Sequence, residues 1–137
     1  DIAKAIAAGA QFLFSPHTDV RSIAVALEAN IPIVPGALTP TEILAAWQAG
    51  ATAVKVFPVS AVGGAAYLRS ICEPLGDIPL IPTGGVTLAN AKGLIEAGAL
   101  AVGLGSTLFP RSSVAAEQWA DITAIACQLR RVLQPLA

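Results

Sequence analysis

The stretch "AVKVFPVSAVGG", residues 53–64, places a lysine inside a run of apolar residues. In an extended strand, side chains alternate, so Val54 and Val56 share one face while Lys55 and Phe57 share the other. The valines suit a covering layer of helices, so we expect Lys55 to point to the inner side of the sheet. Burial lowers a lysine pKa and leaves some free amine, which can condense with a ketone to form a Schiff base. The alternative is a structural lysine that reaches the rim or pairs with an acid.

The length of residues 1–137 is that of one domain. Of these residues, 55% are hydrophobic and 12% are charged, and the net charge is −1. That balance gives no basic surface for nucleic acid or an acidic membrane, and no apolar run approaches the ~18 residues of a membrane span. We therefore expect a cytoplasmic protein with no nucleic-acid or membrane partner. Because the chain opens with Asp1 inside a helical pattern, we also expect an upstream segment. Cys72 and Cys127 are expected to be small buried thiols.

The chain contains a repeated unit. In three segments a helix is expected to end at a glycine and a strand to begin within about three residues, and two further segments carry a short apolar strand ending in proline and glycine. The strands start about 20 to 25 residues apart, with helical patterns between them. This rhythm is typical of strand–helix units and a parallel sheet. The three segments are "AAGAQFLFSP" (7–16), "QAGATAVKVFP" (48–58) and "EAGALAVGLGS" (96–106), and the two are "NIPIVPG" (30–36) and "DIPLIPTGG" (77–85).

Five strands and about five helices favour an α/β fold that forms part of a (β/α)8 barrel, its last five strand–helix units. A whole barrel needs ~200 residues or more, so we expect 1–137 to be a single incomplete barrel domain. An open doubly wound sheet is the alternative. Two helices have sequence support. Thr39 and Glu42 form a capping box, and an apolar stripe marks the last helix. The stripe consists of Trp119, Ile122, Ala126, Leu129 and Leu133.

Two glycine-containing segments follow the strands after Lys55: "PTGG" (82–85) and "GLGS" (103–106). Glycines let the backbone approach a ligand and turn its N–H groups toward an anion, and Thr83 and Ser106 add hydroxyl donors. Loops after the last two strands of a barrel commonly hold phosphate. The pair of segments therefore favours a phosphate site, and ordinary strand-to-helix turns are the alternative for each.

Other polar residues have simpler interpretations. His17 follows a strand end and could contact a ligand, although a place in a loop or at a helix start explains it better. Asp19 is expected to cap a helix, and the capping box explains Glu42. None of the nine carboxylates lies inside an expected strand, so the sequence offers no obvious general base or metal cluster.

The ordered motifs "GAQFLFSP", "IPIVPGALTPTE", "VKVFPVSAVGG", "IPLIPTGGV" and "GLGSTLFP" closely resemble the 2-keto-3-deoxy-6-phosphogluconate / 4-hydroxy-2-oxoglutarate (KDPG/KHG) aldolase family, from about residue 5 to residue 110. The resemblance implies a (β/α)8 barrel, a homotrimer, no metal and no cofactor. It also implies a class I aldolase that cleaves KDPG or KHG, a small keto acid that we expect to be phosphorylated, to pyruvate plus an aldehyde.

The resemblance also assigns roles to residues. Lys55 matches the lysine that forms a Schiff base with pyruvate, and Pro35 and Phe57 match positions that shape the pyruvate pocket. The family's phosphate site falls on Thr83, Gly84, Gly85, Gly105 and Ser106. The family's general base, a glutamate on strand two, lies upstream of the matched part, together with an arginine and a threonine that bind the pyruvate carboxylate.

No residue of this chain matches the family's glutamate, arginine and threonine by position, and this leaves two interpretations open. The chain is either a piece of an ordinary aldolase, inactive alone, or a naturally shortened and inactive relative. The alternative function is a non-catalytic phosphate-binding or assembly barrel in which the lysine is structural. Another phosphate-binding barrel enzyme, such as a thiamine-phosphate-synthase-like protein, is a third interpretation, against which the lack of a carboxylate cluster argues.

Overall fold

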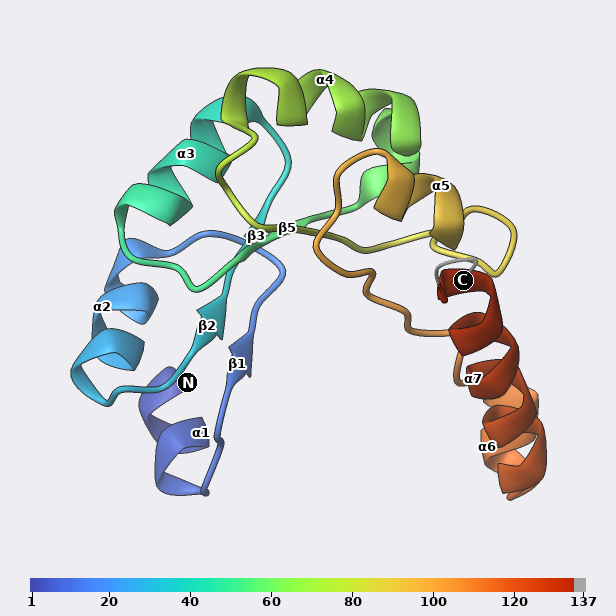
Figure 1. Ribbon diagram of the computed structural model, residues 1–137. Coiled ribbons are helices and arrows are strands. Elements are labelled where there is room, and N and C mark those ends of the chain that lie inside the picture. The colour runs from blue at the N-terminus through green and yellow to red at the C-terminus, as the bar shows by residue number, and fades with distance from the viewer. Residues whose placement is uncertain (135–137) are drawn as a thin grey trace.

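A computed structural model describes residues 1–134, in which strands and helices alternate (Figure 1). Helices α2 to α5 follow the outer side of an arch, and the strands follow its inner side. The elements are α1 (Ile2–Ala7), β1 (Leu13–Phe14), α2 (Val20–Glu28), β2 (Ile33–Val34), β3 (Gly36–Ala37), α3 (Pro40–Gln48), β4 (Val54–Val56), the 3-10 helix η1 (Val59–Val62), α4 (Ala65–Leu75), β5 (Leu80–Pro82), α5 (Ala91–Glu96), α6 (Arg111–Ala115) and α7 (Trp119–Leu133).

The strands are parallel and follow one another in chain order. β1 pairs with β2, and β3, β4 and β5 form a second sheet in that order. Only Pro35 separates β2 from β3, so the expected strand in "NIPIVPG" is one extended segment that pairs first with β1 and then with β4. The parallel α/β arrangement predicted from the repeat is confirmed.

The fifth expected strand, in 96–106, is reduced to a single parallel bridge between Thr83 and Gly103. Two backbone bonds still hold it along β5: Leu100 N–H donates to Leu80 O at 3.0 Å and Gly103 N–H donates to Pro82 O at 2.9 Å. Glycine weakens a strand because it has more backbone freedom to lose. This segment also has β5 on one side and no partner strand on the other within residues 1–134.

The faces of the strands differ as the alternation predicts. Val54 and Val56 are fully buried, in a core formed with residues of α3, α4 and α5 such as Ile43, Leu68 and Leu94. Lys55 lies on the opposite face and is half-buried. A smaller cluster of Leu13, Ile23, Ala26 and Ile33 packs α2 against β1 and β2.

The expected helix ends are present. In the capping box, Thr39 Oγ1 accepts from Glu42 N–H at 3.3 Å and Glu42 Oε2 accepts from Thr39 N–H at 2.8 Å. Asp19 caps α2 by accepting from the Arg21 N–H at 3.2 Å. Gly50, which follows α3, has a φ of 98°, a conformation that favours glycine.

Helix α7 differs from its prediction. Leu129 and Leu133 reach the core, but no residue of α7 is buried, and Trp119 is 58% exposed. Cys127 is likewise exposed, so the expectation of two buried thiols is wrong for it, whereas Cys72 is half-buried and burial raises the pKa of its thiol. The reason is that α7 packs mainly on α5 and the short α6 rather than on a sheet.

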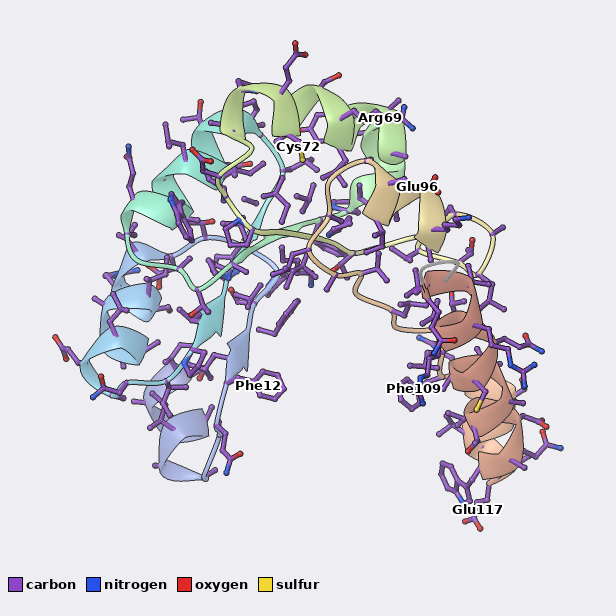
Figure 2. The ribbon with its side chains drawn as sticks, in the orientation of Figure 1. Phe12, Arg69, Cys72, Glu96, Phe109 and Glu117 are labelled. Atoms are coloured by element: carbon purple, nitrogen blue, oxygen red, sulfur yellow. The ribbon has the colours of Figure 1, made fainter. Side chains whose placement is uncertain are left out.

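The inner side of the arch carries large apolar side chains. Phe12 and Phe109 project from its two ends toward the space between them (Figure 2), and they are 67% and 51% exposed. None of the helices described within residues 1–134 has the length and apolar character that a bilayer crossing requires.

Candidate active site

Lys55 occupies the centre of β4, and its backbone is fixed from both sides. Its N–H donates to Pro35 O at 2.9 Å, and the residue pairs with Gly36 of β3 and Ile81 of β5. A central strand position of this kind is rigid, so the lysine side chain projects from a defined point. Pro35 itself is fully buried, so it supports Lys55 through its carbonyl group and not through an exposed ring.

The Lys55 ammonium lies among aromatic rings. Its Nζ is 4.3 Å from the centre of the Phe57 ring and 5.4 Å from that of Phe14. Desolvation by burial lowers the pKa of Lys55, because an apolar environment disfavours the charged form. Within residues 1–134 the ion pairs are Arg21–Asp19 and Lys92–Glu96, so Lys55 has no acidic partner there.

Phe57 connects this lysine to the segment that follows β5. A Cβ on Gly84 would lie 3.0 and 3.1 Å from two carbons of the Phe57 ring, and Gly84 has a φ of 85°. Both facts favour glycine at this position. Its missing side chain leaves the space in which the Phe57 ring sits beside Lys55, so the lysine and the segment 82–85 belong to one site.

The loop after β4 orients two peptide groups of that segment. Val59 N–H donates to Thr83 O at 2.9 Å, and Ser60 N–H donates to Gly84 O at 3.2 Å. In a planar trans peptide the N–H points opposite to the C=O. The N–H groups of Gly84 and Gly85 are therefore turned away from the β4 loop. The sequence analysis missed this role of residues 59 and 60, because backbone donors leave no sequence pattern.

The segments 82–85 and 103–106 are joined directly. Thr107 Oγ1 donates to Val86 O at 2.8 Å, and a Cβ on Gly103 would overlap the Thr83 side chain. The predicted proximity of the two glycine segments is thus present, with Thr107 as a link that the sequence analysis missed.

Several donors in these segments have no partner. The N–H groups of Gly85, Gly105 and Ser106 form no hydrogen bond within residues 1–134, and neither does the Ser106 hydroxyl. The Thr83 hydroxyl donates to Ile81 O at 3.3 Å. Exposed backbone N–H groups without a partner, on two loops that lie next to each other, are available to bind an anion such as phosphate.

Asp19 and Glu42 both form hydrogen bonds at the starts of their helices. Asp19 accepts from the Arg21 N–H and from Ser22 Oγ, and Glu42 accepts from Leu38 N–H, Thr39 N–H and Thr39 Oγ1. In the part of the chain that the structure describes, no group of three or more His, Cys, Asp and Glu side chains could hold a metal ion.

These features define a parallel α/β protein with a partly buried lysine on a central strand and, beside it, two glycine-containing segments whose exposed N–H groups have no partner within residues 1–134. The family model "KDPG and KHG aldolase" matches residues 1–125, and the chain belongs to this family. The 2-dehydro-3-deoxy-phosphogluconate aldolase of Treponema pallidum is 37% identical over 131 residues, covering 95% of this chain and 62% of that protein.

Solved structures agree with this membership. A structure of native KDPGal superposes with a TM-score of 0.85 at 30% identity, covering 97% of this chain and 65% of that one. The KDPG aldolase of Legionella pneumophila, with pyruvate captured as a covalent carbinolamine intermediate, gives a TM-score of 0.77 at 28% identity over 88% of this chain and 58% of that one. The chain spans 62% and 59% of the length of two curated relatives, the aldolases of Treponema pallidum and Dickeya dadantii.

Proposed function

We propose that this chain is the Schiff-base-forming part of a class I aldolase that cleaves a 4-hydroxy-2-keto acid, KDPG or KHG, to pyruvate plus an aldehyde. Family membership supports the reaction class. The observation that carries the mechanism is Lys55, a lysine with a lowered pKa that lies against Phe57 and has no acidic partner within residues 1–134. A neutral amine on a rigid strand is the nucleophile that this chemistry needs.

In the proposed reaction the Lys55 amine attacks the C2 ketone, and loss of water gives an iminium ion. The C3–C4 bond then breaks as a base removes the proton from the C4 hydroxyl, and the electron pair moves into the iminium to form an enamine while the aldehyde leaves. Protonation of the enamine at C3 gives the iminium of pyruvate. Its hydrolysis consumes one water, releases pyruvate and frees the Lys55 amine. The resemblance implies that the base is a glutamate outside the matched residues, and we place it there.

The proposal extends to the fold and the assembly. We place the five strands in a (β/α)8 barrel that further strand–helix units close, in a cytoplasmic homotrimer. Parallel strands in chain order, with helices on the outer side of the arch, support the barrel, as does the superposition on 65% of the native KDPGal chain.

Trapping with borohydride tests the Schiff base. In the full-length protein, pyruvate plus borohydride is expected to leave one covalent adduct, on Lys55, detected by peptide mass mapping. Lys4 and Lys92 serve as internal controls because both are exposed to water, and Lys92 also pairs with Glu96 at 3.7 Å. An adduct on another lysine, or no adduct, would support the non-catalytic barrel instead.

The second part of the proposal concerns substrate recognition. We place a phosphate group of the substrate at Thr83, Gly84, Gly85, Gly105 and Ser106. The unpaired N–H groups described above support this site, and so does its position in the sheet: the segment 82–85 follows β5, the strand next to Lys55, and 103–106 lies beside it. Binding energy from a remote phosphate would align the reacting bond without touching it.

Gly105→Asp tests the phosphate site. A Cβ on Gly105 would meet no atom within 4 Å, and this residue does not have a positive φ, so the chain tolerates the change. Gly85 is unsuitable because its Cβ would overlap Ser60. The added carboxylate should repel phosphate and raise KM for KDPG by about tenfold, roughly 1.4 kcal/mol, while KM for unphosphorylated KHG changes little.

Gly93→Asp is the matched control for this experiment. Gly93 lies in α5 and also has free space around a Cβ, so both KM values should stay unchanged. Equal increases for the two substrates in Gly105→Asp would mean that the glycine segments only form turns.

A further inference from the structure

A second aromatic ring, that of Phe14, contacts the Lys55 ammonium from β1. Lys55 Nζ lies over this ring, 5.4 Å from its centre, and it lies 4.3 Å from the centre of the Phe57 ring. Both distances are within the ~6 Å at which the electron-rich face of an aromatic ring attracts a cation. The sequence analysis gave Phe57 a place in the site through the family resemblance, but it gave Phe14 no role.

The backbone holds the two side chains on one face of the strands. Leu13 is buried, whereas Phe14 is 46% exposed, so β1 alternates as β4 does and Phe14 points to the inner side, as Lys55 does. Phe14 pairs with Val34 and Lys55 pairs with Gly36. These two partners lie on one extended segment, so the ring and the ammonium project from points that are fixed relative to each other.

Gly36 allows the end of β1 to approach this segment. A Cβ on Gly36 would overlap the Pro16 carbonyl, so any side chain here would push away the backbone that follows Phe14. Thr18 Oγ1 also donates to Gly36 O at 2.8 Å and holds the same loop in place. Neighbouring strands are about 4.8 Å apart, and the side chains of Phe14 and Lys55 together span two such spacings. The contact between ring and ammonium therefore depends on the close approach at Gly36.

Two aromatic faces are a particular environment for a lysine. Burial lowers the pKa of Lys55, and no carboxylate within residues 1–134 forms an ion pair with it. A carboxylate at this position would strongly favour the ammonium and leave little free amine. A ring face attracts positive charge more weakly than a carboxylate does and cannot take up a proton. The rings therefore stabilise a cation on the nitrogen without suppressing the free amine that attacks the ketone.

The iminium ion of the proposed reaction suits this environment better than the ammonium does. An ammonium has three N–H donors, and ring faces replace the lost water poorly for all three. An iminium ion has one N–H group, and its charge is shared between the nitrogen and C2, so it loses less when water is excluded. An environment that favours the iminium ion over the state before it promotes the covalent step.

We propose that Phe14 is a second cation-binding residue of the site, and that its ring and the Phe57 ring together stabilise positive charge on the Lys55 nitrogen. For the ammonium this role needs no substrate. For the iminium ion it rests on the proposed aldolase reaction, in which the charged nitrogen stays bonded to Lys55 and therefore stays beside both rings.

Fluorinated phenylalanines at position 14 test the charge interaction separately from packing. Each fluorine withdraws electrons from the ring face and weakens its attraction for a cation, while the size of the ring changes little. In the full-length protein, labelled with ¹³C at the lysine ε carbon, the pKa of Lys55 should fall stepwise from phenylalanine to the mono-, di- and trifluorinated forms. The Lys55 signal is identified by its loss in Lys55→Met.

The same series at position 12 is the matched control. Phe12 is also on the inner side of the arch (Figure 2), but in the described part of the chain the rings in contact with Lys55 Nζ are those of Phe14 and Phe57. Fluorination of Phe12 should therefore leave the pKa of Lys55 unchanged.

Trapping measures the effect on the iminium ion. Phe14→Leu removes the ring face and keeps an apolar side chain, so the pyruvate concentration for half-maximal borohydride trapping on Lys55 should rise about threefold or more. Trifluorophenylalanine at position 14 should have a similar effect. Phe14→Tyr keeps the ring face and should stay close to the parent protein.

The two measurements separate this inference from the proposed function. A stepwise fall in the pKa of Lys55 without any pyruvate adduct would support the cation-binding role of Phe14 and reject the aldolase reaction. A pKa that does not change across the fluorinated series would overturn the inference, whether or not pyruvate is trapped, because Phe14 would then be only an apolar wall.

Discussion

Lys55→Arg is expected to abolish aldol cleavage and pyruvate trapping while the protein stays folded. Arginine can occupy the same half-buried position on β4, but its guanidinium remains protonated and cannot condense with a ketone. Pyruvate release from KDPG measures the effect, and turnover should fall below detection. Measurable turnover in this variant would show that another group forms the covalent intermediate or that none is needed.

Lys55→Met measures how the charge of Lys55 affects the stability of the folded protein, separately from its role in the reaction. Because burial lowers the pKa of Lys55 in the folded state, the bound proton opposes folding at every pH below the lowered value. This destabilisation declines as the pH rises from the lowered pKa to the ordinary lysine pKa, and it vanishes above the latter. The methionine variant should therefore melt at a higher temperature near neutral pH, with a difference in Tm that shrinks toward high pH.

Lys92→Met provides the control for that measurement. Lys92 is exposed and pairs with Glu96 across one helical turn, and such surface pairs contribute little to stability. Its replacement should change Tm slightly and with no comparable pH dependence. A Lys55→Met protein that melts lower than the parent near neutral pH would contradict the desolvation of this lysine.

Local patterns predicted much of this structure. The alternation of Val54, Lys55 and Val56 was sufficient to assign which face each side chain occupies. The capping box of Thr39 and Glu42 marked the start of α3. These features depend on neighbours within a few residues, so they can be derived from sequence without knowing the rest of the fold.

The parts that the sequence did not predict depend on contacts between distant segments. Thr107 joins its loop to Val86, and backbone donors at residues 59 and 60 orient Gly84 and Gly85. No local pattern encodes these contacts. The same holds for the contact of Gly36 with the Pro16 carbonyl, which joins two loops that are 20 residues apart along the chain.

The last prediction concerns residues 1–137 expressed without any further segment. We expect this chain to associate and to show no aldol cleavage. Within residues 1–134, β1 has a partner strand only in β2, so its other edge presents unpaired N–H and C=O groups that invite pairing with another chain. Phe12, Leu100 and Phe109 are 67%, 65% and 51% exposed, and exposed apolar surface of this kind favours association.

Light scattering measures the association of the isolated chain, thermal melting its cooperativity, and pyruvate release its cleavage activity. Supplying the first strand–helix units of a family member as a separate chain should restore a cooperative transition and cleavage, because the added strands cover the edge of β1 and bring the base. Phe12→Ser with Phe109→Ser should reduce association of the isolated chain, since both side chains project toward the inner space of the arch (Figure 2). Trp119→Ser, equally exposed but on α7, should not.

Cleavage by the isolated chain would require a base among its own residues. That outcome would overturn the assignment of the base to a glutamate outside the matched residues. Asp19 is the carboxylate nearest in sequence to the end of β1, but the Arg21 N–H and the Ser22 hydroxyl already bond to it, and Ser22, first among its contacts, lowers its pKa. An acid held in its ionised form by a helix cap is a weak base. If the 137-residue chain were soluble, melted cooperatively and cleaved KDPG, the base would have to be one of its own carboxylates. Such a carboxylate, Asp19 for example, is a helix cap in this structure.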